Sequence, residues 1–418
     1  MHISLVLEEK LLCLQWIRQC GVGRNRRVLG AFFRVYEQNN SCLSKNRYFC
    51  NLHSNKGKML NSFCIHNFKN IGDLTIPKLR QVNLIVGKNS VGKSTLLEAL
   101  SLYISDGDEL DLRDTLKNRG ESVDDVRDAE YEASVKEHYL SLFKDWEENH
   151  SKSFYILVGE TPQRSIRISQ VFANIEIEEG TGNRKTNVFH QEDLYDNDKF
   201  TDDYSEGLLV ESEQDSKIIR YSRKMVLSSI RKKSYQMVHT MDFHSSANAI
   251  LYDKISLSAI EGYIIRALNI INPNIEKIAF ISEDSRNRNR IPVVSLKGGD
   301  KRVRLSSMGD GINRILTIIL SLLNAKDGYL LLDEFETGLH YSVQKQLWEI
   351  IFLLAEALNV QVFVTSHSTD CLRTFSQTNT NEKGMLIRLE QRQSGIVPVC
   401  YENNNDIRYA AINNIELR

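Results

Sequence analysis

The alternation of hydrophobic and polar positions becomes regular from Met59 onward. Segments 63–71 and 73–77 have the pattern of two strands, which we expect to pair with each other. The short, mostly apolar run over 82–86 predicts a buried strand that ends on a glycine. A helix with apolar residues on one face is predicted directly afterwards, over 92–104. A strand, a glycine-containing loop and a helix in direct succession are the setting of a phosphate-binding loop.

The middle of the chain has a mixed pattern. We predict the structure of four segments there: a charged, helix-like stretch over 106–149, a partly alternating strand pattern over 164–178, a polar loop over 180–206, and an amphipathic helix over 253–271. No heptad repeat persists for the many turns that a coiled-coil arm needs. We therefore expect a compact lobe here rather than a rod.

Residues 1–58 differ from the rest of the chain. They hold four of the seven cysteines and an excess of arginine and lysine, without a sustained periodicity. Two interpretations stay open: an upstream extension of the reading frame with Met59 as the natural start, which we favour, and an organelle transit peptide. The segment is left out of fold prediction. The odd number of scattered cysteines favours reduced thiols in a cytoplasmic protein.

Composition narrows the class of protein. A length of 418 residues fits two or three domains. The formal net charge of -1 does not indicate a polyanion binder, and 41% hydrophobic residues are enough for a sizeable core. The longest apolar runs reach about half of the roughly 20 residues that a membrane helix needs. We therefore expect a soluble protein that does not enter a membrane.

Residues 87–94 fit the phosphate-loop pattern G-x-x-x-x-G-K-[ST] at every fixed position. Its glycines let backbone N–H groups turn towards a β-phosphate, and the following helix adds the positive end of its dipole. Lys93 can reach the β- and γ-phosphates, and the Ser94 hydroxyl is a natural Mg²⁺ ligand. The alternative is a glycine-rich turn that only starts a helix. The predicted nucleotide-binding residues of this loop are Gly87, Lys88, Asn89, Ser90, Val91, Gly92, Lys93, Ser94 and Thr95.

A second motif ends the fully apolar strand 329–332 on two adjacent carboxylates, Asp333 and Glu334. Open α/β sheets bind ligands at the carboxyl ends of their strands. We predict that Asp333 holds Mg²⁺, through water, and that Glu334 orients or deprotonates the attacking water. An exposed acidic pair that merely ends a core strand is the alternative.

Two further segments point to the same chemistry. The apolar strand 362–364 leads through hydroxyl residues to His367, which can hydrogen-bond a γ-phosphate and sense its presence, although a histidine after a strand is usually structural. Ser307 and Gly309 open the helical run 312–324 and form a second phosphate cradle. Since one chain does not need two cradles for one nucleotide, the second is predicted to serve a nucleotide on a partner molecule.

In this order, the motifs resemble the ATP-binding-cassette class of P-loop ATPases, and more narrowly the RecF/SMC-like and OLD-type (overcoming lysogenization defect) prokaryotic ATPases. The resemblance covers about half of the chain and is carried by FCIHNFKNIGDLTIPKLRQVNLIVGKNSVGKSTLLEAL, LSSMGDGINRILTIILSLL, YLLLDEFETGLHYSVQ, VFVTSHSTD and YENNNDIRYAAINNIELR. It implies an α/β P-loop NTPase fold with a mixed sheet and an inserted α+β lobe. It also implies ATP and Mg²⁺ as ligands, and a homo-oligomer, dimeric or higher, in which two subunits sandwich ATP. Ser307 and Gly309 would then act in trans, and residues 336–343 would communicate across the dimer.

The chain also departs from these families. Met308 and Asp310 stand where transporter cassettes have glycine and glutamine, which counts against a transporter subunit. No clear counterpart of the metal-contacting glutamine is found, since Gln163 and Gln170 fit only by position. Segment 207–215 resembles the opening of a Toprim nuclease motif but lacks its later partners. The chain ends about fifty residues past His367, so no Toprim domain is expected and any cleavage would belong to a partner protein.

We therefore predict an extension over 1–58, an ATPase core built from 59–105 and 271–418, and an inserted helical and β lobe over 106–270. The predicted function is ATP hydrolysis that switches a dimer, in phage defence or DNA maintenance, with a separate effector or nuclease. The alternative is a nucleotide-gated scaffold that holds a toxin or nuclease partner with little turnover.

Two basic clusters are open to two interpretations. A solvated charged surface is the default, and contact with the phosphate backbone of DNA or RNA is the alternative. The clusters consist of Arg220, Arg223, Lys224, Arg231, Lys232 and Lys233, and of Arg286, Arg288, Arg290, Lys297, Lys301, Arg302 and Arg304.

Overall fold

The structure is a computed structural model that describes ten stretches of the chain. They are residues 59–117, 131–146, 155–177, 184–190, 204–213, 215–221, 235–240, 245–282, 290–299 and 302–412. The predictions made for residues 1–58 lie outside them.

The core of the fold is a mostly parallel sheet. Within the described stretches it has six strands, in the order β16-β15-β3-β14-β13-β9. Neighbouring strands from β15 to β9 are parallel, whereas β16 forms an antiparallel hairpin with β15. This order brings the carboxyl ends of β3, β13 and β14, which carry three of the predicted motifs, to the same end of the sheet. The strands are β3 (Val82–Gly87), β9 (Tyr235–Val238), β13 (Tyr329–Leu332), β14 (Gln361–Ser366), β15 (Gly384–Arg392) and β16 (Gly395–Tyr401).

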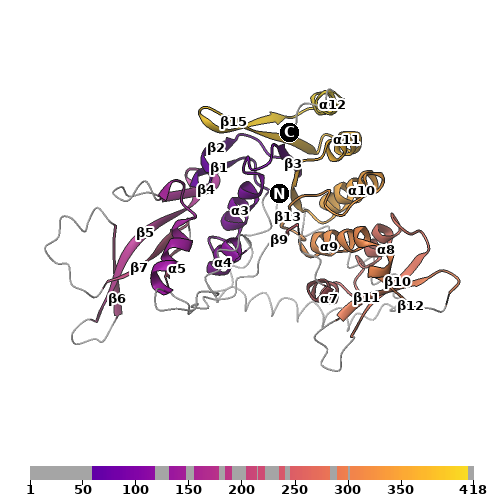
Figure 1. Ribbon diagram of the computed structural model, residues 1–418, viewed down its shortest axis with the longest axis horizontal. Coiled ribbons are helices and arrows are strands. Elements are labelled where there is room, and N and C mark those ends of the chain that lie inside the picture. The colour runs from indigo at the N-terminus through magenta and orange to yellow at the C-terminus, as the bar shows by residue number, and fades with distance from the viewer. Residues whose placement is uncertain are drawn as a thin grey trace, which may run out of the picture. The chain divides into compact units, whose positions relative to one another are not determined.

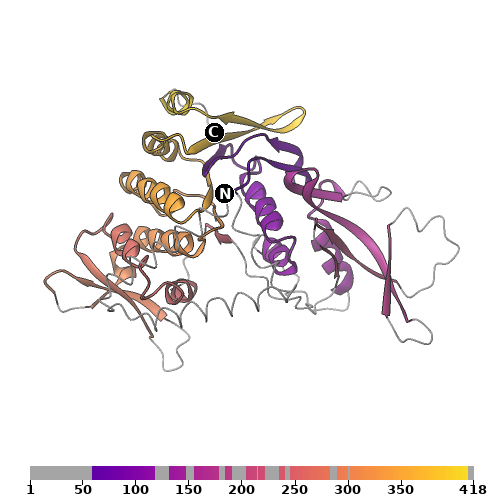
Figure 2. The same cartoon turned by 180° about the vertical axis from the view of Figure 1, so that it is seen from behind.

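Successive side chains of the core strands enter two different hydrophobic clusters, because they point to opposite faces of the sheet. Leu84 and Val364 pack with residues of α9, α10 and α11, whereas Ile85 and Phe363 pack with residues of α3 and of a second sheet. Figures 1 and 2 show these two layers from opposite sides. The helices are α3 (Lys93–Ile104), α9 (Asp310–Asn324), α10 (Tyr341–Ala357), α11 (Thr369–Thr378) and α12 (Asn404–Ile412).

The second sheet is antiparallel. Its described strands have the order β2-β1-β4-β5-β7-β8, and β6 pairs with one half of the long strand β5. The predicted pairing of the first two strands is confirmed, with Phe63 opposite Ile76. The elements of this region are β1 (Phe63–Phe68), β2 (Ile71–Ile76), α4 (Glu109–Lys117), α5 (Tyr131–Leu140), β4 (Tyr155–Thr161), β5 (Arg164–Ile177), β6 (Arg184–Phe189), β7 (Ser205–Glu211) and β8 (Ser216–Arg220).

The predicted loop over 180–206 is wrong in part, because Arg184–Phe189 forms strand β6. This strand pairs residue by residue with β5, from Phe172 opposite Phe189 to Ile177 opposite Arg184. The long β5 therefore presents a backbone edge on which a polar segment can form a ladder. Composition alone does not reveal such an edge, because strand propensity depends strongly on context.

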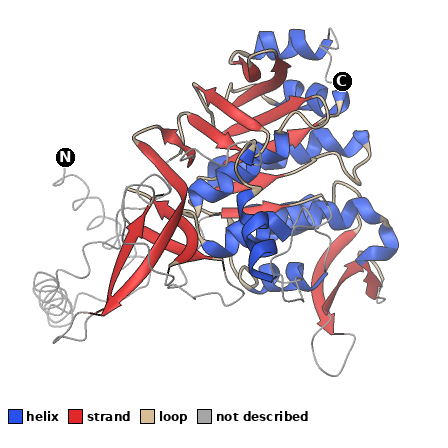
Figure 3. Ribbon diagram, turned by 60° about the vertical axis from the view of Figure 1, so that its left-hand side comes forward, coloured by secondary structure: helices blue, strands red, loops and turns tan. Residues whose placement is uncertain are grey.

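A third sheet contains β10 (Ile275–Ser282), β11 (Arg290–Leu296) and β12 (Arg302–Arg304), next to the helices α7 (Ser245–Asp253) and α8 (Gly262–Leu268). The strands are red in Figure 3, where this sheet can be told apart from the helices. A short 3₁₀ helix, η3 (Leu305–Met308), follows β12.

The single amphipathic helix predicted over 253–271 is wrong. α7 ends at Asp253 and α8 begins at Gly262, with turns between them and a positive φ of 63° at Leu257. The Ser256 hydroxyl donates to the Asp253 carbonyl, and the Leu257 N–H donates to the Glu261 carboxylate. These local side-chain bonds give the backbone an alternative to the helix, which the apolar spacing alone does not register.

The predicted α/β P-loop fold with a mixed sheet is confirmed. The division at residues 105 and 270 stays a prediction. Within the part of the chain that the structure describes, no helix is long and apolar enough to cross a membrane.

Candidate functional site

The loop between β3 and α3 has a conformation that requires glycine at two positions. Gly92 caps α3 with a φ of 98°, in the left-handed region. A Cβ on Gly87 would lie 2.6 Å from the carbonyl oxygen of Leu389, so any side chain there would collide with the backbone of β15. Val91 is buried beneath the loop, whereas Lys88, Asn89 and Ser90 are exposed on it. The loop is thus an open backbone cradle at the amino end of a helix, which suits an anion.

Lys93 is folded back over this cradle. Its Nζ donates to the carbonyl oxygens of Gly87, at 2.9 Å, and Lys88, at 2.8 Å. Burial lowers the pKa of the Lys93 ammonium, while the negative charges of Asp333, Glu334 and Glu336 act in the opposite direction. The ammonium therefore lies where the loop would hold phosphates, with the carboxylates of the second motif near enough to act on it.

The structure brings the two predicted Mg²⁺ ligands together across 239 residues of sequence. The Ser94 Oγ lies 3.1 Å from both carboxylate oxygens of Asp333. A hydroxyl and a carboxylate are hard oxygen donors of the kind Mg²⁺ prefers, so this pair fits the ion. Among the described residues no group of three or more His, Cys, Asp or Glu side chains could hold a metal. In nucleotide sites Mg²⁺ usually takes its other ligands from phosphate oxygens and water.

Thr95, also predicted to bind nucleotide, is buried inside α3, at 3% exposure. Ser94, by contrast, is only partly buried and faces the carboxylate of Asp333. The Ser94 hydroxyl, and not that of Thr95, therefore faces the side on which the loop would bind a ligand.

Glu334 is held by two hydroxyl groups. Its backbone N–H donates to Thr365 Oγ1 at 2.9 Å, and its Oε2 accepts a hydrogen bond from Thr337 Oγ1 at 3.1 Å. Its φ of 48° is in the left-handed region, which is strained for a residue with a side chain. Thr365 also donates to Asp333 Oδ1 at 2.5 Å, so this one hydroxyl orders both acidic residues.

Sequence reasoning did not single out Thr365. It is a buried residue near the end of β14, and β14 lies next to β13 in the sheet. The only hint in the sequence was its position among the hydroxyl residues before His367. This position becomes informative only when β13 and β14 are known to be neighbours.

Arg314 is a second residue that the sequence analysis missed. It is fully buried on α9, where its Nη1 donates to the His239 carbonyl at 2.8 Å. Its Nη2 donates to the carbonyl oxygens of Asp333, at 2.7 Å, and Glu334, at 3.2 Å. The helix that follows Ser307 and Gly309 is therefore tied to the backbone of the acidic pair. A charged residue within the apolar run of α9 was the available signal.

His367 lies directly after β14 and is half exposed. Its backbone N–H donates to Glu336 Oε1 at 2.8 Å, and its Nδ1 lies 3.1 Å from the same oxygen. The predicted histidine thus stands at the same end of the sheet as the phosphate loop and the acidic pair.

Ser307 and Gly309 lie in the turn that leads into α9. Ser307 is exposed and donates its hydroxyl to the Arg304 carbonyl at 2.7 Å, and Gly309 caps α9 with a φ of 98°. A Cβ added to Gly309 would meet nothing within 4 Å. Across the described stretches, no hydrogen bond or ion pair joins Ser307 or Gly309 to the phosphate loop. These two predicted site residues are therefore exposed at the amino end of α9.

Other predicted candidates also lie elsewhere. The Gln170 amide donates to Glu206 on β7 at 3.2 Å, and Gln163 lies in the turn between β4 and β5. In the basic clusters, Arg290 pairs with Asp253, and Arg220, Lys297, Arg302 and Arg304 are described. The other cluster members lie outside the described stretches.

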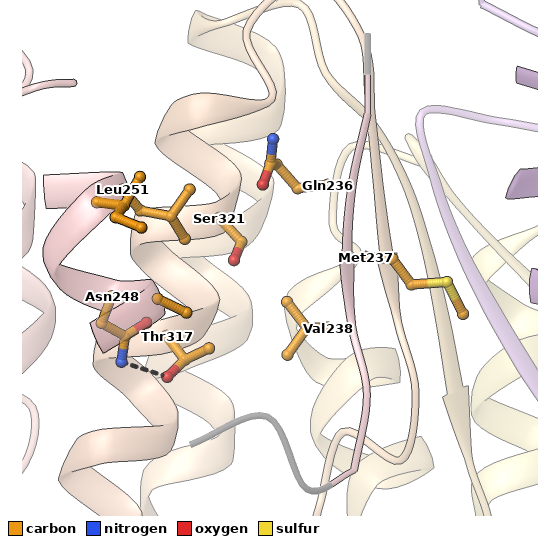
Figure 4. Close-up of a pocket in the computed structure, with 9 residues that line it drawn as sticks. Gln236, Met237, Val238, Asn248, Leu251, Thr317 and Ser321 are labelled. Carbon is orange, nitrogen blue, oxygen red and sulfur yellow. Dashed lines mark hydrogen bonds between the residues drawn. The ribbon is translucent and has the colours of Figure 1, made fainter. Parts of the chain in front are cut away.

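The structure also has a cavity of about 320 Å³ between β9, α7 and α9. Figure 4 shows polar side chains at its wall, where the Asn248 amide donates to Thr317 Oγ1 at 2.9 Å. Gln236 and Ser321 also line it. None of the predicted nucleotide or metal residues lines this cavity, so it is distinct from the phosphate loop.

Comparison with known proteins gives a family for the chain. The sequence model described as the AAA ATPase domain matches residues 59–372. An "ATP/GTP phosphatase" of Helicobacter pylori is 24% identical over 377 residues, which are 83% of this chain and 96% of that protein. A crystal structure of an Smc head bound to the C-winged helix domain of ScpA aligns with a TM-score of 0.46 and 12% identity, covering 84% of this chain and 100% of that one. The SMC head domain from Thermotoga maritima aligns with a TM-score of 0.41 and 14% identity, over 83% of this chain and 100% of that one.

Proposed function

Because this chain belongs to the family of AAA ATPase domains, and is therefore an ATPase, we propose that ATP joins two copies of it and that hydrolysis separates them. The observation that carries this proposal is that the turn of Ser307 and Gly309 is exposed and, within the described residues, makes no hydrogen bond or ion pair with the phosphate loop. The phosphate loop and the acidic pair form one half-site, and the exposed turn of Ser307 and Gly309 forms the other. A two-fold symmetric dimer would place each turn against the nucleotide of the other copy.

In the first half-site, the loop and Lys93 bind the phosphates and neutralise their charge. Ser94 and Asp333 would hold Mg²⁺, which, when bound, stabilises the charge that develops on the phosphate oxygens. Glu334 orients the attacking water and accepts its proton, and Thr337 fixes the carboxylate through its hydrogen bond to Oε2. His367 contacts the γ-phosphate and so distinguishes ATP from the product.

In the second half-site, the exposed hydroxyl of Ser307 and the open amino end of α9 complete the phosphate contacts in trans. Arg314 then links this contact to catalysis within the same chain. Its guanidinium ties α9 to the carbonyl oxygens of Asp333 and Glu334, so a displacement of the helix would be felt at the acidic pair.

The related protein from Helicobacter pylori supports the hydrolytic part of the proposal, since its name gives release of phosphate from ATP or GTP as its activity. The resemblance to OLD-type ATPases supports a cellular role in phage defence or DNA maintenance, with a separate effector or nuclease. The basic clusters support contact with a nucleic-acid backbone only through their charge.

Subunit complementation tests the trans arrangement. Neither Lys93→Ala nor Ser307→Arg alone is expected to release phosphate from ATP, because each homodimer lacks an intact composite site. A heterodimer of the two variants has one intact site, made from the Lys93 of one chain and the Ser307 of the other. Random pairing of equal amounts should restore about a quarter of the wild-type rate, because half of the dimers carry one of two sites.

The control for complementation is a mixture of Lys93→Ala with Glu334→Gln. Both substitutions lie in the same half-site, but each chain keeps a normal turn of Ser307 and Gly309. In a heterodimer each site is therefore damaged once, and no recovery is expected. Phosphate release that stays at background in the first mixture at every ratio would contradict action in trans.

A further inference from the structure

The hydroxyl of Thr365 is a fully buried polar group that contacts both members of the acidic pair. The Glu334 backbone N–H donates to Oγ1 at 2.9 Å, and Oγ1 lies 2.5 Å from Oδ1 of Asp333. A backbone N–H can only donate, and an ionised carboxylate can only accept. Oγ1 therefore accepts from Glu334 and gives its single hydrogen to Asp333, so the direction of both bonds is fixed.

The bond to Asp333 engages one carboxylate oxygen and not the other. Hydrogen bonds from a hydroxyl to an ionised carboxylate are about 2.5–2.7 Å long and about twice as strong as neutral ones. Thr365 makes this bond to Oδ1, whereas the only hydrogen-bond partner of Oδ2 among the described residues is the Ser94 hydroxyl, at 3.1 Å. The carboxylate is thus held through Oδ1, while Oδ2 stays beside the other proposed Mg²⁺ ligand.

The path of the chain around the acidic pair does not depend on this bond. The Asp333 N–H donates to the carbonyl oxygen of Val238 at 2.9 Å, and the Phe335 N–H donates to that of Thr365 at 3.0 Å. Parallel pairing also joins β13 to β14 residue by residue. These bonds fix the backbone on both sides of Glu334. The contact between the Thr365 hydroxyl and the Asp333 carboxylate therefore orients a side chain.

We propose that Thr365 is a positioning residue that orients the Asp333 carboxylate for Mg²⁺ and holds Glu334 in place through its backbone N–H. This inference rests on the roles proposed above for Asp333 and Glu334. Thr365 acts through these residues and not on the nucleotide, because it is fully buried and its one hydrogen is already donated. Partners of this kind behind a metal-binding carboxylate contribute about 10–100-fold to metal affinity or activity.

A purely structural role is the plainer alternative. In that account the hydroxyl only provides an acceptor for the buried Glu334 N–H. Its loss would then lower the stability of the protein but leave the metal affinity of the folded chain unchanged. If Thr365 acts through the carboxylate, its loss weakens metal binding, and this effect disappears once the Asp333 side chain is removed.

The experiment measures metal binding directly in the full chain. Mn²⁺ replaces Mg²⁺, because carboxylate oxygens suit both ions, and electron paramagnetic resonance counts the free Mn²⁺ in the presence of ADP. The variants are Thr365→Val, which keeps the shape without the hydroxyl, Thr365→Ser, which keeps the hydroxyl, Asp333→Ala, and the double variant Thr365→Val/Asp333→Ala.

Thr365→Val is expected to weaken Mn²⁺ binding by about 10–100-fold, and Thr365→Ser to bind Mn²⁺ like the wild type. The double variant should bind no more weakly than Asp333→Ala. Without metal, Thr365→Val should bind a fluorescent ATP analogue with the wild-type affinity, because the phosphate loop is intact. This contrast separates an effect on the metal from a general loss of the site.

Thermal unfolding checks that each variant is folded. Thr365→Val leaves the Glu334 N–H without its acceptor, so this chain can lose stability. If it does not unfold in one cooperative transition, Thr365→Cys takes its place. A thiol is only a weak donor and a weak acceptor, so Thr365→Cys is also expected to bind Mn²⁺ at least about tenfold more weakly than the wild type.

Three results would overturn the inference and leave the proposed ATP-dependent dimer in place, since that is read from the mass in solution. They are wild-type Mn²⁺ affinity in the variant without the hydroxyl, a Thr365→Ser chain that binds as weakly as that variant, and a further loss in the double variant beyond that of Asp333→Ala. Wild-type Mn²⁺ affinity in Asp333→Ala would instead overturn the metal-binding role of Asp333, and the inference with it.

Discussion

Replacing Lys93 with alanine is expected to abolish ATP hydrolysis and to weaken ATP binding at least about a hundredfold. The Lys93 ammonium bonds to the carbonyl oxygens of the loop and would turn to the phosphates when these are present. Hydrogen bonds to charged groups contribute about 1.5–3 kcal/mol each, and each 1.4 kcal/mol is tenfold in affinity. Titration with a fluorescent ATP analogue measures the loss of binding, and phosphate release measures the loss of turnover.

The matched control for this prediction is Lys345→Ala, which removes an exposed ammonium from α10. It should bind and hydrolyse ATP like the wild type, with the same thermal unfolding midpoint as Lys93→Ala. Near-normal affinity in Lys93→Ala would mean that the loop between β3 and α3 is only the turn that starts a helix.

Replacing Glu334 with glutamine is expected to lower turnover by about a thousandfold while ATP binding is retained. General-base catalysis contributes roughly 10²–10⁴ in rate, and the amide cannot accept the proton of water. The amide can keep the hydrogen bond from Thr337, and the backbone bond to Thr365 does not involve the side chain. Single-turnover phosphate release together with ATP binding by filter assay separates the chemical step from affinity.

The control is Glu349→Gln, which removes an exposed carboxylate from α10, outside the site. It should leave both the rate and the affinity unchanged. Normal turnover in Glu334→Gln would mean that Glu334 is not the general base of the reaction.

The parts of the site that could be predicted from the sequence are those whose chemistry lies in contiguous residues. The loop from Gly87 to Ser94 and the pair Asp333 and Glu334 are each found in one short segment. That segment contains both the motif and the strand that precedes it. Parallel pairing of the strands then brings Ser94 to Asp333, as expected from motifs at the carboxyl ends of neighbouring strands.

The residues that sequence reasoning missed owe their roles to tertiary contacts. Thr365 matters because β14 lies beside β13 in the sheet. In the sequence, Arg314 resembles any charged residue in a helix. Only the structure shows that its guanidinium donates hydrogen bonds to three backbone carbonyls. None of these contacts has a signature in local spacing.

The two errors in secondary structure have the same origin. The segment Arg184–Phe189 becomes a strand because β5 offers it an edge, which is a non-local effect. The helix expected over 253–271 is broken by bonds from Ser256 and Leu257 to nearby groups, which compete with helical hydrogen bonds despite the apolar spacing.

The central claim is that ATP joins two subunits through the Ser307 turn, and the mass of the Glu334→Gln protein in solution tests it most directly. Light scattering with and without Mg-ATP compares the two states while hydrolysis is blocked. The proposal predicts one subunit mass without nucleotide and twice that mass with Mg-ATP, and it predicts that Ser307→Arg in the same background abolishes the increase. A mass that does not respond to Mg-ATP, or one that doubles equally in the Ser307→Arg protein, would contradict it.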